Sequence, residues 1–216
     1  MYISSFVKIR TIAVSSLRHN FLPHLILSVL LLLVTPFVFG TANVDAKAAA
    51  IPLEMFVSLI GIILITPVFL PEQQENIRDA VESKATSPVC VYVIRIGTSL
   101  LAMLALITIF VCYMKGNGCA ISLPSAVYGA FSGGIFLGAL GLLAYGASRV
   151  ITVGYMVPLT YYMLNLFGAK KIFGNLYLFS MTSGSMTEKY WLFAAGLILI
   201  TLALLVRNKA LHLRAL

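Results

Sequence analysis

The chain has 216 residues, of which 60% are hydrophobic and only 10% are charged, and its formal net charge is +8. A soluble domain usually carries about 25% charged residues, so a globule of this size cannot hide so much apolar surface in its own core. With a mean hydropathy of +0.99, the composition indicates a protein covered by lipid and excludes an ordinary soluble domain.

The first nineteen residues have the pattern of a helix that lies in the membrane interface. Aromatic and aliphatic side chains recur on one side, while Lys8, Arg10 and Arg18 fall elsewhere. Such a distribution is typical of helices whose apolar face enters the headgroup region. The alternative is an ordinary basic flank of the first span. No small-residue cleavage pattern follows, so we expect no removable signal peptide.

Six apolar stretches are long enough to be transmembrane helices, since about 20 apolar residues cross the hydrocarbon core. They comprise residues 21–40, 51–70, 90–113, 125–147, 151–168 and 190–206. These stretches are continuous rather than alternating, which argues against transmembrane β-strands. The sequence therefore predicts an all-α polytopic membrane protein with one transmembrane domain over residues 1–216. The fifth stretch is the shortest of the six except for the last and contains several polar residues.

The distribution of lysine and arginine predicts that both termini are cytoplasmic. With this orientation, ten basic residues lie inside and five lie outside, as the positive-inside rule requires. The net charge is then explained by topology and by contact with anionic lipid headgroups of the cell membrane. The basic residues are scattered among several loops, which is a poor match to a nucleic-acid partner.

Glu54 is the one acid well inside an apolar stretch, about one turn into the second span on its outer side. A carboxylate costs on the order of 3 kcal/mol at mid-bilayer and less near the surface. Two interpretations remain open. Glu54 faces a polar pathway through the protein, or its side chain reaches the outer headgroups, and its position near the edge favours the second.

A charged segment, residues 71–88, separates the second and third apolar stretches. It holds four of the chain's seven acids, Glu72, Glu75, Asp79 and Glu82. Pro71 suits the first turn of a helix, and the Thr-Ser-Pro sequence at 86–88 ends one. The segment therefore favours a short cytoplasmic helix over residues 72–86. A solvated loop with helical tendency is the alternative.

This expected helix is amphipathic. Its narrow apolar face consists of Ile77, Ala80 and Val81 at helical spacing. On the rest of its surface, Arg78 and Glu82 are placed to pair one turn apart.

The fourth span is rich in glycine at spacings that place small residues on common faces: Gly129, Gly133, Gly134, Gly138 and Gly141. Glycine lets helix backbones approach closely in lipid. The pattern predicts a tight helix contact, either static packing within one subunit, which we favour, or a contact that slides during function.

The fifth span and the segment after it are less regular. The span contains polar aromatic and amide side chains, namely Tyr155, Tyr161, Tyr162 and Asn165, together with Pro158. They suit a helix that is kinked or faces a cavity, and equally an aromatic belt at the outer surface. Residues 169–189 are too many for a tight turn.

The order of these features resembles the transmembrane subunit of a type-2 ABC transporter, the exporter-type permease family. The resemblance covers nearly the whole chain in layout, and it is most specific from Glu72 to Pro88, followed by Tyr92 and Arg95. The glycine-threonine pair common in that helix of the family is replaced here by Asn76 and Ile77.

The resemblance implies that residues 72–86 are a coupling helix that docks on a separate ATP-binding subunit, where ATP and Mg are bound. The residues expected to take part in this coupling are Glu72, Glu75, Ile77, Arg78, Asp79, Val81 and Glu82. The charged ones would dock on the ATP-binding subunit, whereas Ile77 and Val81 would hold the helix to the membrane-spanning part. It also implies a second copy or a similar permease subunit, because six spans form half of the pathway. Residues Ile172–Met181 would form an outer re-entrant segment; an amphipathic loop on the outer leaflet is the alternative. The expected pathway residues are Glu54, Tyr155, Tyr161, Tyr162 and Asn165.

Other functions fit the residues less well. The sequence has no G-x-x-x-x-G-K-[ST] motif and no paired catalytic groups within the spans, so we expect no enzymatic activity in this chain. The substrate-binding membrane component of a vitamin-type importer and a small channel or structural membrane protein remain alternatives. Cys112 and Cys119 lie near the outer surface, where a disulfide and a chance pair are equally compatible with the sequence. No cysteine or histidine spacing indicates a metal. We expect the cargo of an exporter of this kind to be a small amphiphile, a drug or an antimicrobial peptide.

Overall fold

The computed structural model describes residues 21–73, 88–168 and 170–212. Throughout these ranges the chain forms helices and turns, and no strand occurs in them. The predicted interfacial helix, residues 1–19, and all but the first two residues of the predicted coupling helix, residues 72–86, lie outside the described part. The all-helical class predicted from the sequence is confirmed.

The main helices match the apolar stretches closely. The elements are α2 (Leu22–Phe39), α3 (Ala46–Met55), η2 (Val57–Leu59), α4 (Ile60–Ile65), η3 (Thr66–Gln73), α6 (Pro88–Gly116), α7 (Leu123–Ser148), α8 (Ile151–Phe167), α9 (Lys170–Phe173), η4 (Gly174–Leu176) and α10 (Thr187–His212). Among the described residues, five helical stretches are long and apolar enough to cross a membrane: α2, the composite helix Ala46–Leu70, α6, α7 and α10. The remaining predicted span, the fifth at residues 151–168, corresponds to α8, whose 17 residues are fewer than in any of these five.

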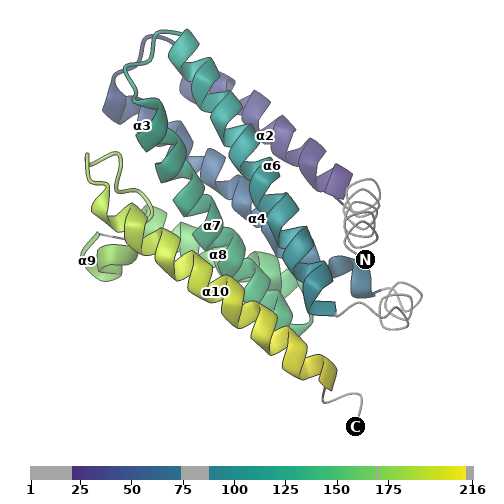
Figure 1. Cartoon of the computed structure of the whole chain (residues 1–216). Coiled ribbons are helices and arrows are strands. Elements are labelled where there is room, and N and C mark those ends of the chain that lie inside the picture. The colour runs from purple at the N-terminus through teal and green to yellow at the C-terminus, as the bar shows by residue number, and fades with distance from the viewer. Residues whose placement is uncertain (1–20, 74–87, 169, 213–216) are drawn as a thin grey trace.

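The helices run roughly along one direction, and α7 lies at the centre of the bundle (Figure 1). It packs against α10, α8, α4 and α6. In both α7 and the composite helix Ala46–Leu70, 72% of the most apolar 18-residue stretch is buried, whereas in α2 only 17% of that stretch is buried. The chain therefore has an inner pair of helices covered by outer helices, and the outer surfaces are rich in exposed leucine, isoleucine, valine and phenylalanine.

Glycine explains how the inner pair comes so close. A Cβ atom built on Gly61 would lie 1.9 Å from the carbonyl oxygen of Gly134, and one on Gly138 would lie 2.5 Å from the carbonyl oxygen of Gly61. Only residues without a side chain fit here, so the backbones of α4 and α7 touch directly. The glycines predicted to form a tight contact all face neighbours within this chain, Gly129 against Met181 and Gly141 against Thr66.

The composite helix Ala46–Leu70 is not a regular α-helix. The α-helical turns of α3 and α4 are separated by the 3₁₀ turn η2, and a second 3₁₀ stretch, η3, follows α4. Pro52, Pro67 and Pro71 lack the backbone N–H that a continuous helix needs. Short 3₁₀ pieces within a longer helix are typical of strained or hinge positions.

The bundle has two distinct ends. We call the end that carries α9, the α2–α3 connection and the α6–α7 connection the α9 end; the start of α2, the end of η3, the start of α6 and the end of α10 lie at the opposite end (Figure 1). At the α9 end the two connections are joined by backbone hydrogen bonds, from Asn43 N to Asn117 O at 2.9 Å and from Ala120 N to Val44 O at 3.0 Å. The thiol of Cys119 donates to the carbonyl of Thr41 at 3.1 Å, and both Cys112 and Cys119 are free.

Candidate functional site

A buried ion pair joins α3 to the start of α10. The ammonium of Lys189 lies 2.7 Å from Oε1 of Glu54, and each residue is only 1% exposed. Two charged groups without contact to solvent are costly unless they are paired and hydrogen-bonded. Their other contacts therefore decide whether this pair is stable.

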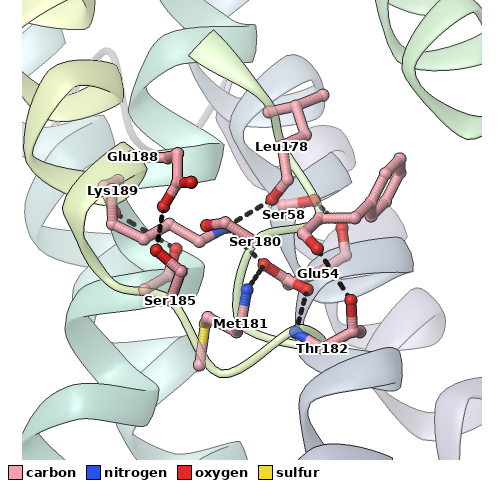
Figure 2. Close-up of polar contacts among 12 residues, drawn as sticks. Glu54, Ser58, Leu178, Ser180, Met181, Thr182, Ser185, Glu188 and Lys189 are labelled. Carbon is pink, nitrogen blue, oxygen red and sulfur yellow. Dashed lines mark hydrogen bonds and ion pairs between the residues drawn. The ribbon is translucent and has the colours of Figure 1, made fainter. Parts of the chain in front are cut away.

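Both charged groups have further partners in the turn that precedes α10. The carboxylate of Glu54 accepts hydrogen bonds from the backbone N–H groups of Met181, at 2.8 Å, and Thr182, at 3.1 Å. The ammonium of Lys189 also donates to the carbonyl oxygen of Leu178 (Figure 2). The ion pair thus fixes the backbone of residues 178–182 between α3 and α10, and we call these residues, with the two charges, the Glu54–Lys189 cluster.

Local sequence places Glu54 at this position. The side chain of Asp45 accepts a hydrogen bond from Ala48 N at 3.2 Å and so caps the start of α3. Glu54 follows just over two turns later, immediately before the helix ends at Met55. The hydroxyl of Ser58 in η2 donates to the carbonyl oxygen of Glu54, which satisfies a backbone group that the interrupted helix would otherwise leave free.

The turn itself is shaped by its small residues. The carbonyl of Ser180 accepts from the N–H groups of Ser183, at 3.2 Å, and Ser185, at 3.0 Å, and Gly184 N donates to Met181 O at 2.8 Å. Gly184 has a φ of +79°, which is readily adopted only by glycine. The turn is therefore a compact hydrogen-bonded structure and not an open loop.

Helix α8 holds the same segment from another side. Asn165 is fully buried, and its side-chain oxygen accepts from Leu178 N at 3.1 Å. The hydroxyl of Tyr161 donates to Leu176 O at 2.6 Å, and that of Tyr162 donates to Met55 O, at the end of α3, at 2.9 Å. These side chains connect α8 to the segment and to the helix that carries Glu54.

Four of the five residues predicted to line a pathway therefore gather around one segment: Glu54, Tyr161, Tyr162 and Asn165. Tyr155 lies near the start of α8 and packs at the edge of an apolar cluster that includes Phe136 and Tyr162. Their role in a pathway stays a prediction. The interpretation that Glu54 reaches the outer headgroups is wrong, because its carboxylate is buried and faces Lys189 and backbone amides.

Lys189 is the functional candidate that the sequence did not reveal. In the sequence, Lys189 is one of the five basic residues on the predicted outer side, but in the structure it is among the largest fully buried side chains. The available signal was the presence of one acid and one base at the outer ends of two different apolar stretches. Because these stretches are far apart in sequence, their contact depends on the packing of the bundle.

Residues Ile172–Met181, predicted as a re-entrant segment or an amphipathic loop, divide into two parts. The first part contains α9 and η4, and Ile172 is 75% exposed. The second part is buried, with Leu178 and Phe179 inside an apolar cluster and Ser180 without exposure. The segment is helical where it is exposed and forms turns where it enters the bundle.

A second group of interactions lies at the opposite end, where the charged segment leaves η3. The ring of Phe69 is fully buried and meets Tyr92 edge-on at 4.9 Å between ring centroids. The guanidinium of Arg207 lies over the same ring, 5.6 Å from its centroid, in the geometry of a cation–π interaction. η3, α6 and α10 are thus joined a few residues from Gln73 and Pro88, where one described range ends and the next begins. Of the predicted docking residues, only Glu72 falls in a described element, at the end of η3.

No protein-family model, curated protein or solved structure matches this chain. Over the ranges 21–73, 88–168 and 170–212, the structure defines an all-helical protein with five helices long and apolar enough to cross a membrane. Its most distinctive described feature is the Glu54–Lys189 cluster at the α9 end.

Proposed function

We propose that this chain is the membrane-spanning permease subunit of an ATP-driven ABC exporter. In this proposal, a separate ATP-binding subunit hydrolyses ATP and the chain couples that hydrolysis to movement of a substrate across the cell membrane. The observation that carries the proposal is the course of the composite helix Ala46–Leu70. It leads from the Glu54–Lys189 cluster at the α9 end to η3 at the opposite end (Figure 1), and η3 runs in sequence into the charged segment 71–88.

The packing of the composite helix favours the transmission of movement from the charged segment to the Glu54–Lys189 cluster. The composite helix touches the backbone of α7 at Gly61, and Phe69 is held by Tyr92 and Arg207. Directly packed backbones deform little, because close-packed interiors leave no free volume to absorb a shift. A displacement of the charged segment would therefore be passed along the helix to Glu54 and to the turn that Glu54 holds.

The parts of the proposed mechanism follow from this arrangement. The acids of residues 72–86 would contact the ATP-binding subunit, which supplies ATP and Mg, and a second copy or similar subunit would complete the pathway. The buried turn at residues 178–182 would open or close the outer exit as the composite helix moves. A small amphiphile, a drug or an antimicrobial peptide is the cargo we propose, with both termini of the chain in the cytoplasm.

The proposal is tested by co-expressing the chain with ATP-binding subunits of ABC transporters from the same genome and measuring which of them co-purifies with it. The double variant Glu75→Lys with Asp79→Lys reverses two of the proposed docking charges and should abolish the association. Lys47→Glu is a matched control, since Lys47 is exposed at the α9 end, and it should leave the association intact. Association that survives the double charge reversal would contradict the coupling role.

A further inference from the structure

A pocket of about 170 Å³ opens at the α9 end beside the Glu54–Lys189 cluster. Its walls come from three parts of the chain: one face of α3 along most of its length, the start of α7 with the residues just before it, and the turn before α10. The lining residues are Ala46, Ala50, Leu53, Ile121, Ser122, Ser125, Ala126, Met181, Gly184 and Met186.

The pocket is apolar inside and polar only at its edge. Ala50, Leu53 and Ala126 are buried, with exposures of 2%, 0% and 3%. The two hydroxyl groups belong to Ser122, which is exposed, and Ser125, and they hydrogen-bond to each other. None of the lining residues is charged, so a charged group placed inside would lose its hydration without gaining a partner.

The third wall is held in place independently of any ligand. Met181, which lines the pocket, donates its backbone N–H to Glu54 and lies against the backbone of α7 at Gly129. Gly184 is fixed by its hydrogen bond to Met181 O. Small-molecule sites are usually formed before the ligand arrives, and the pocket has this property.

Its size limits what it can hold. A cavity of about 150 Å³ accommodates benzene in a protein core, whereas pockets for drug-sized molecules reach about 300 Å³ or more. A volume of about 170 Å³ therefore fits a group of roughly six carbons. The serine hydroxyls at the edge are placed to hydrogen-bond to an uncharged polar group attached to it.

From these observations we infer that the pocket is a binding site for a small uncharged amphiphile, with an apolar group of about six carbons in the pocket and a hydroxyl-like group at Ser122 and Ser125. The assignment does not require that the chain transports this molecule. Binding and transport can therefore be tested separately, and a chain that fails to associate with an ATP-binding subunit would still bind this ligand.

The test uses the full chain in detergent micelles and a hexanol that carries a photoreactive diazirine. After illumination, the labelled residues are identified by mass spectrometry. We expect saturable labelling at the pocket residues, with competition by unlabelled n-hexanol. The filling variants Ala50→Leu and Ala126→Leu, which occupy the pocket from two different walls, should each reduce this labelling by about tenfold or more, because the apolar contact of several methylene groups is lost.

Ala194→Leu provides the matched control, because Ala194 is exposed on α10 and does not line the pocket, so its substitution should leave the labelling unchanged. Circular dichroism and gel filtration identify any filling variant that fails to fold. Saturation of the labelling is measured on the unmodified chain, so this part of the test does not depend on the folding of a variant. Three results would overturn the assignment: labelling that rises without saturation and spreads over the exposed helix faces, labelling that persists in both folded filling variants, or labelling displaced by phospholipid but not by hexanol.

Discussion

Replacement of Lys189 by methionine should destabilise the protein strongly. The ammonium and the carboxylate of Glu54 are 2.7 Å apart, and neither side chain is more than 1% exposed, so water does not screen the charge that remains. Breaking a buried pair by removing one partner costs about 3–5 kcal/mol. Lys189→Met also removes the donor to the carbonyl of Leu178, which places the expected loss in the upper half of that range.

Removal of both charges should cost less than removal of one. In the double variant Glu54→Gln with Lys189→Met, the glutamine carbonyl still accepts one of the two backbone N–H groups of Met181 and Thr182. The remaining loss is about two hydrogen bonds at about 1 kcal/mol each. The double variant is therefore expected to be about 2 kcal/mol less stable than the unmodified chain, and more stable than Lys189→Met alone.

The assay is equilibrium unfolding of the purified chain in mixed micelles titrated with dodecyl sulfate and followed by circular dichroism. Lys115→Met serves as the control, because Lys115 is exposed at the same end of the bundle and its loss should change stability by no more than about 0.5 kcal/mol. The reasoning would be refuted by a Lys189→Met variant as stable as this control, or by a double variant less stable than the single one.

Three further predictions address packing, hydrogen bonding and topology. Gly61→Ala should lower the free energy of unfolding by about 1–3 kcal/mol because its methyl group meets the backbone of α7, whereas Gly97→Ala, with no atom within 4 Å of the new methyl group, should be neutral or stabilising in the same dodecyl sulfate titration; equal effects would contradict the close contact. Tyr162→Phe should cost about 1 kcal/mol through loss of its hydrogen bond to a carbonyl of α3, measured by the same unfolding assay, and an unchanged midpoint would count against that bond. In a chain without other cysteines, a membrane-impermeant maleimide should label Lys47→Cys in intact cells and Ser148→Cys only after permeabilisation. Both residues are exposed, and α3, whose second residue is Lys47, starts at the α9 end, whereas α7, which ends at Ser148, ends at the opposite end; the reverse result would invert the proposed orientation.

The helices could be predicted from the sequence because lipid imposes a simple requirement on length and polarity. The stretch 125–147 became α7, residues 123–148, and the stretch 90–113 became α6, residues 88–116. The helices extend past the apolar stretches because backbone hydrogen bonding continues outside the hydrocarbon region. The interruptions in the composite helix were harder to predict. Proline marks where a helix is weakened, but it does not show whether the α-helix there becomes a 3₁₀ turn such as η2 or only bends.

The candidate site could be predicted only in part. Glu54, Tyr162 and Asn165 stood out because polar side chains are rare in apolar stretches. Their partners did not, since most are backbone groups, and every residue carries the same backbone N–H and carbonyl whatever its type. Glu54, for example, binds the N–H groups of Met181 and Thr182, which are distant in sequence.

By itself, the sequence determined that the described part of the chain is helical, where its long apolar helices lie, and that a charged segment separates two of them. These properties follow from local composition, because apolar stretches are driven out of water whereas charged segments keep their hydration. Only the tertiary structure decided that Glu54 and Lys189 form one buried pair and that this pair holds the turn before α10. The glycine contact between α4 and α7 brings the inner helices together and so determines which distant residues meet, and such a meeting depends on the packing of the whole bundle.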